Sequence, residues 1–136
     1  MTDRSLAAMG IVALIFLGGF LGGIGGDAVG PREYPERPPT VDAETAGPYA
    51  AAYEEVYRHN RTVEEETETI REIVVGAGVV SVSERDDGYD IVVSVDYYWT
   101  FGADGPDRPI VIADGEPYEA TSFVNETTTD RLGDTL

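Results

Sequence analysis

Apolar residues alternate with mostly polar ones, without a break, from Tyr89 to Phe101. Side chains two positions apart lie on the same face of a β-strand, so this pattern gives a strand one apolar face and one mostly polar face. An apolar face of this length needs a covering element, which predicts an antiparallel sheet packed on one side. The residues of the apolar face are Tyr89, Ile91, Val93, Val95, Tyr97, Trp99 and Phe101.

Turn sequences on both sides of this strand predict an antiparallel meander. Asp86-Asp87-Gly88 is a hairpin signal, and it follows a first predicted strand at Val79–Arg85. A loop follows the long strand over residues 102–109. The remaining predicted strands are Ile110–Ala113, Tyr118–Val124 and a last one at Thr127–Leu132.

The segment before the first strand has helical spacing. Large apolar residues recur every three or four positions from Tyr49 to Val74, which predicts one long amphipathic helix with its apolar stripe on the sheet. Thr45 is the expected N-cap, and a Gly-Ala-Gly sequence ends the element. Glu54 and Arg58 lie four positions apart and are expected to pair on the helix surface.

These elements predict an α+β domain in which one long helix packs on an antiparallel sheet of about four strands. The order of one helix followed by a meander resembles that of cystatin-like and NTF2-like folds, in which a sheet curls around a helix. The resemblance spans Thr45–Leu132 and lies in the order of the elements. It implies a fold, and it brings no catalytic residue with it.

An uncharged run of 21 residues, Leu6–Gly26, precedes the domain. As a helix it spans roughly 30 Å, the thickness of a bilayer core, whereas a cleavable signal peptide has an apolar region of about 7–15 residues. The run predicts a retained transmembrane anchor, with cleavage near Gly26 or Ala28 as the alternative. Glycines four apart, at Gly18, Gly22 and Gly26, would let two such helices pack closely.

The flanking charges set an orientation in the cell membrane. Arg4 precedes the span and Asp27 follows it, which predicts a cytoplasmic N-terminus and a C-terminal domain outside. The sequences starting at Asn60 and Asn125 are glycosylation acceptors for an exported chain. Four prolines between residues 27 and 47 predict an extended spacer. The chain thus divides into an anchor (1–26), a Pro-rich linker (27–47) and an extracytoplasmic domain (48–136).

The charge balance excludes some classes of partner and indicates the solvent in which the protein works. The formal net charge is −17, lysine is absent, and there is no cysteine. Such a surface repels nucleic acid, and the composition excludes disulfides and thiolate metal sites. Self-repulsion is screened in brine, since the Debye length falls from roughly 10 Å at 0.1 M salt to about 3 Å at 1 M. The composition resembles that of haloarchaeal proteins, and the chain resembles the small membrane-anchored exported proteins of haloarchaea.

Few residues are arranged for catalysis. His59 is the one histidine, no nucleophile is spaced to it, and it is expected at the surface or edge of the helix. Carboxylates gather near the turns, as chance predicts in a chain with 26 acidic residues, and the Asp-x-Asp-x-Asp-Gly pattern of a calcium loop is absent. The sequence therefore predicts no metal, no cofactor and no enzymatic activity.

Aromatic residues near the end of the long strand are the candidates for a ligand or interface site. Three of them lie on the face that packs on the helix, which predicts core packing, whereas Tyr98 lies on the other face and is expected to be exposed. The four residues are Tyr97, Tyr98, Trp99 and Phe101.

The leading functional prediction is a membrane-anchored, extracytoplasmic, non-enzymatic protein of a halophile. It would act at the cell envelope by binding a protein partner or by self-association. One alternative is a small-ligand site at the aromatic residues. Another is a filament subunit, since pilins also begin with an apolar helix.

Overall fold

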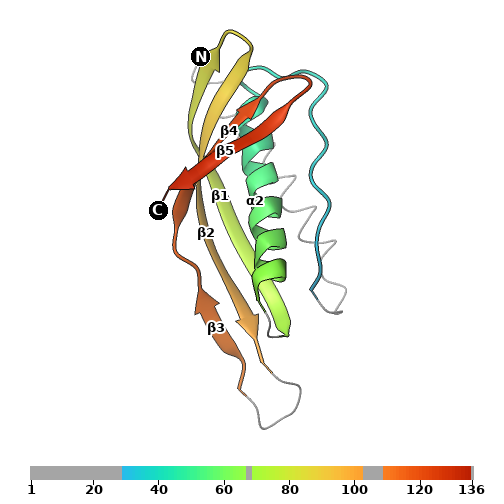
Figure 1. Ribbon diagram of the computed structural model, residues 1–136, viewed down its shortest axis with the longest axis vertical. Helices are drawn as coiled ribbons and strands as arrows, with labels where there is room; N and C mark the ends of the chain where they lie inside the picture. The colour runs from blue at the N-terminus through green and yellow to red at the C-terminus, as the bar shows by residue number, and fades with distance from the viewer. Residues whose placement is uncertain (1–28, 67–68, 103–108, 136) are drawn as a thin grey trace.

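The computed structural model describes residues 29–66, 69–102 and 109–135, and it has an α+β fold. One helix lies between an antiparallel sheet and an extended segment that precedes the helix (Figure 1). Five strands form the sheet, which confirms the predicted class of one helix on an antiparallel sheet. The elements are α2 (Ala46–Glu65), β1 (Ile70–Arg85), β2 (Gly88–Phe101), β3 (Val111–Asp114), β4 (Tyr118–Val124) and β5 (Thr129–Thr135).

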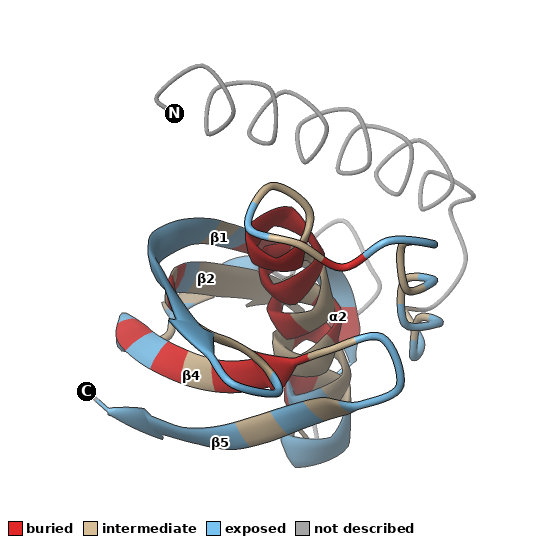
Figure 2. Ribbon diagram, turned by 90° about the horizontal axis from the view of Figure 1, so that it is seen from above, coloured by how far each residue is buried: buried red, intermediate tan, exposed pale blue. Residues whose placement is uncertain are grey.

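The long strand β2 organises the sheet. It pairs with β1 along one side, and on its other side it pairs with β4 near its start and with β3 near its end. β5 pairs with β4 and corresponds to the last predicted strand. The order β1-β2-β4-β5 makes β1 and β5 the two outer strands, and the sheet curves around α2 (Figure 2).

The core lies between α2 and the inner face of the sheet. Ile91, Val93 and Val95 of β2 are buried there, as the alternating pattern predicts. The helix meets them with small side chains, including Ala50 and Ala51, so that its backbone lies close to the sheet. The two-residue period of β2 therefore fixes which face of the sheet the helix covers.

The predicted boundary between helix and first strand is wrong. α2 ends at Glu65, and β1 begins at Ile70 rather than Val79. Consecutive glutamates at residues 64–66 place negative charge at the C-terminal end of the helix, where the helix dipole disfavours it. The segment beyond is rich in isoleucine and valine, which favour strands. The predicted helix, which was extended to Val74 on its apolar spacing, thus included both the end of α2 and the start of β1.

The helix start also differs in detail from its prediction. Thr45 occupies the N-cap position, but its side chain makes no capping hydrogen bond to the helix. Its hydroxyl instead donates to the Thr40 carbonyl oxygen at 2.7 Å. Asp42 turns the chain into the helix by accepting the backbone N–H groups of Glu44 and Thr45 at 2.8 and 3.0 Å. The polar turn before the helix, rather than a single cap, positions its first residue.

Residues 29–45, here called the strap, belong to the domain. The strap is extended, as its prolines predict, but it is not the free spacer expected for the linker. It runs antiparallel to α2 on the side away from the sheet (Figure 1). The ring of Tyr34 lies 4.5 Å from that of Tyr53, and the Arg37 guanidinium lies 5.9 Å from the Tyr49 ring. Aromatic and arginine side chains between the prolines supply these contacts.

No helix in the described part of the chain is both long enough and apolar enough to cross a membrane. The predicted span, Leu6–Gly26, and its packing glycines Gly18, Gly22 and Gly26 lie outside the described residues.

Candidate functional site

A buried charged cluster joins the helix α2 to β4 and to the outer strand β5. Glu54 of α2 is 1% exposed and accepts two hydrogen bonds from Arg131 of β5, at 2.8 Å from Nε and 3.0 Å from Nη2. The Tyr118 hydroxyl of β4 donates to the same carboxylate at 2.6 Å. We call these three residues the Glu54 cluster. Both carboxylate oxygens are occupied, so the cluster fastens three elements and presents no free acid or base.

The surroundings of the Glu54 cluster support this structural role. Burial and the hydrogen bond to Glu54 raise the pKa of Tyr118, which keeps the phenol protonated and donating. The Arg131 guanidinium lies 3.9 Å from the centre of the Tyr57 ring and also bonds to Asp134 at 2.8 Å. The predicted pair between Glu54 and Arg58 does not form, because Glu54 points into the core.

His59 is buried, so its predicted place at the surface or edge of the helix is wrong. The strap covers it, and its Nε2 lies 2.8 Å from the Gly30 carbonyl oxygen. Burial lowers the pKa of His59, which favours the neutral imidazole with Nε2–H donating to that carbonyl. His59 therefore holds the strap and is not free for acid–base chemistry.

Asn60 binds the strap beside His59. Its Oδ1 accepts the Arg32 backbone N–H at 2.8 Å, and its Nδ2 donates to the Arg32 carbonyl oxygen at 3.0 Å. The amide thus satisfies both backbone groups of one strap residue. A glycan would be attached to this same Nδ2, so glycosylation at Asn60 would have to break the contact.

The four aromatic candidates do not form one site. Tyr97 packs against the core, with the Trp99 ring 5.9 Å away and the Arg58 guanidinium 4.6 Å above its face. The space beside Tyr97 is also filled by Gly115, where an added Cβ would collide with the phenol ring. Tyr98 lies on the opposite face, as predicted, but it is only partly exposed.

Trp99 and Phe101 lie nearer the end of β2 and are partly buried. Trp99 pairs with Ala113 of β3, and Phe101 pairs with Val111. Beside them, three consecutive aliphatic residues, Ile110–Ile112, are exposed. We call these three residues the apolar tip. Sequence reasoning placed a strand here but missed the exposure, because an unbroken apolar run is typical of a strand buried on both faces.

The outer edge of β1 is a second surface that the sequence did not single out. β1 has 16 residues and pairs only with β2 among the described strands. Ile73–Ser83 contains no charged residue, and Val79, Val80 and Val82 are exposed. Register shifts between Val79 and Ser81, so Val80 is the extra residue of a β-bulge. The remaining edge presents unpaired backbone groups beside apolar side chains.

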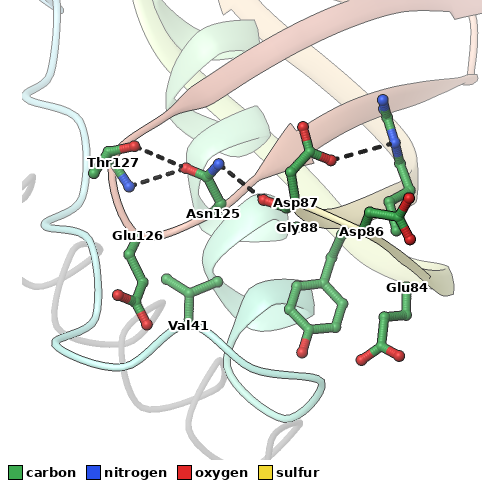
Figure 3. Close-up of a pocket in the computed structure, with 10 residues that line it drawn as sticks. Val41, Glu84, Asp86, Asp87, Gly88, Asn125, Glu126 and Thr127 are labelled. Carbon is green, nitrogen blue, oxygen red and sulfur yellow. Dashed lines mark hydrogen bonds and ion pairs between the residues drawn. The ribbon is translucent and has the colours of Figure 1, made fainter.

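An acidic groove of about 390 Å³ lies at the β1–β2 hairpin (Figure 3), at the opposite end of the sheet from β3 (Figure 1). Asn125 closes one side of it, donating from Nδ2 to the Asp87 carbonyl oxygen at 2.9 Å. Within the described ranges, no group of three or more histidine and acidic residues is placed to hold a metal ion. The carboxylates of the groove belong to Glu84, Asp86, Asp87 and Glu126.

Comparison of the chain with protein families, with curated proteins and with solved structures finds no match. The resemblance in element order to cystatin-like and NTF2-like folds therefore stays a prediction.

Proposed function

We propose that this protein is a membrane-anchored extracytoplasmic domain that binds another protein at the edge of β1. The observation that carries the proposal is the uncharged outer edge at Ile73–Ser83, which is exposed at Val79, Val80 and Val82, in a chain with a net charge of −17. An extended segment of a partner can add to such an edge as a further strand, with backbone hydrogen bonds providing affinity.

The charge distribution favours this edge over the rest of the surface. Two acidic proteins repel each other wherever carboxylates face one another, and the Debye length of about 3 Å at 1 M salt leaves only close pairs unscreened. A partner that approaches Ile73–Ser83 meets no carboxylate on that stretch of β1. The chemistry fits an extended, uncharged segment, from a partner protein or from a second copy.

The membrane part of the proposal rests on the sequence. Leu6–Gly26 is long and uncharged enough for a single span, and Arg4 before it favours a cytoplasmic N-terminus. The described domain then lies outside the cell membrane. The absence of lysine and the excess of carboxylates suit a protein that works in strong brine.

Photo-crosslinking of the full chain tests the proposed interaction. A photoreactive side chain placed at Val80 should form adducts in native membranes kept in molar salt. The matched control is Leu132 on the other outer strand, which is also an exposed aliphatic bulge residue. Adducts from position 80 and none from position 132 support binding at the β1 edge. Equal adducts from both positions, or none from position 80, would contradict it.

A further inference from the structure

The apolar tip is exposed because the helix does not reach it. α2 contacts β1, β2 and β4 but not β3, so neither face of β3 is covered by the helix. Ile110, Val111 and Ile112 are 58%, 44% and 66% exposed. Neighbouring residues of a strand point to opposite faces, so the tip presents aliphatic side chains on both. Water contacts this apolar surface from two sides.

The chain enters the domain at the same end. The strap runs antiparallel to α2, and its first contacts, from Gly30 and Arg32, are to His59 and Asn60 near the C-terminal end of the helix. Figure 1 shows this entry and β3 toward the same end of the molecule, away from the β1–β2 hairpin. The strap therefore brings the preceding sequence to the end that carries the apolar tip.

Chain length limits how far the predicted membrane span can lie from this entry. Four peptide steps separate Gly26 from Gly30, so the end of the apolar run lies within about 14 Å of Gly30. A span that ends at Gly26 therefore holds this end of the domain against the bilayer surface.

Carboxylates lie at both ends of the molecule. The acidic groove, with Asp86 and Asp87, lies at the β1–β2 hairpin (Figure 3), which is at the end away from the strap entry (Figure 1). At the end of α2, the carboxylates of Glu64 and Glu65 both pair with Arg61, at 3.5 and 3.3 Å. Two carboxylates at the end that carries the tip are thus paired with an arginine, which lowers the electrostatic cost of bringing this end to a lipid surface.

We infer that the apolar tip inserts its aliphatic side chains into the interface of the membrane that anchors the chain. This inference rests on the proposed membrane anchor. The domain then stands on the bilayer with the β3 end down and the acidic groove outward. Trp99, which pairs with Ala113 of β3, lies just above the tip, in the region where tryptophan is enriched in membrane proteins.

Site-specific quenching on the full chain tests the orientation. The chain has no cysteine, so Ile112→Cys provides a single attachment point for an environment-sensitive fluorophore. Val80→Cys is the matched control, because Val80 is also an exposed aliphatic residue, 53% exposed, but lies on β1 toward the acidic end. Both variants are reconstituted into phosphatidylglycerol vesicles that carry a nitroxide at the headgroup. We expect several-fold stronger quenching at position 112 than at position 80.

Flotation of the same vesicles separates the two hypotheses. If the chain floats with the vesicles and both positions are quenched equally, the result supports the membrane anchor and contradicts insertion of the apolar tip. If the chain does not float, the anchor itself fails, and the inference fails with it. Ile110→Cys gives a second labelled position at the tip, and it should be quenched like position 112. Circular dichroism of each variant verifies that the labelled chains are folded.

Discussion

The two outer strands of the sheet carry the same irregularity in different chemical surroundings. Val80 on β1 and Leu132 on β5 are the extra residues of β-bulges, and they are 53% and 52% exposed. Around Leu132, β5 carries the charged residues Asp130 and Asp134, whereas Ile73–Ser83 of β1 carries none. Bulges and charges both hinder the pairing of an outer strand with other chains. β5 has both protections, and the Ile73–Ser83 stretch of β1 has only the bulge.

The strands also differ in how they are held. β5 is fastened to the helix by Arg131, whose guanidinium reaches Glu54 under the sheet. The part of β1 from Gly76 to Arg85 is almost entirely exposed, and among the strands that the structure describes it pairs only with β2. The comparison indicates that β5 is a protected outer strand, whereas the outer edge of β1 is unprotected over Ile73–Ser83. Four experiments follow from this comparison, ordered by the expected effect of the substitution on the free energy of unfolding.

Arg131→Met should have the largest effect, because it leaves the Glu54 carboxylate buried without its partner. The expected loss is about 3–5 kcal/mol, measured by urea unfolding followed through Trp99 fluorescence. The double variant Glu54→Met with Arg131→Met removes both charges and should recover much of the loss. A loss below about 1 kcal/mol for Arg131→Met would mean that β5 is not held through this pair.

Gly133→Ala tests the backbone of β5 beside its bulge. Gly133 has a φ of 147°, which side-chain-bearing residues rarely adopt, and an added Cβ would meet no atom within 4 Å. The expected loss of about 1–3 kcal/mol is therefore backbone strain alone. Gly78→Ala on β1 is the control, since its Cβ also meets nothing and its φ is not positive. If the two variants lose equal stability, the bulges of the two strands do not differ in strain.

Glu55→Gln changes the helix without touching either outer strand. Burial raises the pKa of Glu55 from 4.5 to about 7, and Arg32, 3.6 Å away, offsets only part of that shift. Between these values the folded chain keeps a proton that the unfolded chain has lost, so stability falls as the pH rises through about 7.

The variant lacks this loss and should exceed the wild type in stability by about 1–3 kcal/mol near pH 8, with little difference below about pH 4.5. Urea unfolding across this pH range measures the difference. Association through β1 should not change with pH in the way that this difference in stability does. An equal pH dependence of stability in the variant and the wild type would show that Glu55 does not titrate as described.

Val80→Lys and Leu132→Lys should have the smallest effect on folding, within about 0.5 kcal/mol, since both side chains are half exposed. Their effects on association should differ. A charge at the β1 bulge is expected to weaken association about tenfold, whereas the same charge on β5 leaves it unchanged. Analytical ultracentrifugation and co-purification of the full chain in detergent provide the readout. Equal weakening by both variants would remove the distinction between the strands.

Local sequence patterns predicted those parts of the fold that are determined within a single stretch of the chain. The alternation in β2 identified its buried face because the strand period does not depend on the partner. The end of α2 was missed because apolar spacing alone cannot separate a helix from a following strand rich in Val and Ile. The Glu54–Arg131 pair joins residues 77 positions apart, so only the fold brings them together. His59 was misplaced for the same reason, since its cover comes from the strap.

The path of the strap also determines how the domain would respond to mechanical load. A pull on the N-terminal side of the chain reaches the contacts of Gly30 and Arg32 first, before any strand is loaded. Because the strap runs antiparallel to α2, these contacts would open one after another and not all together. Release of residues 29–45 would lengthen the tether by up to about 60 Å while helix and sheet stay folded. Single-molecule pulling from the N-terminus would record this as an extension step before the main unfolding event.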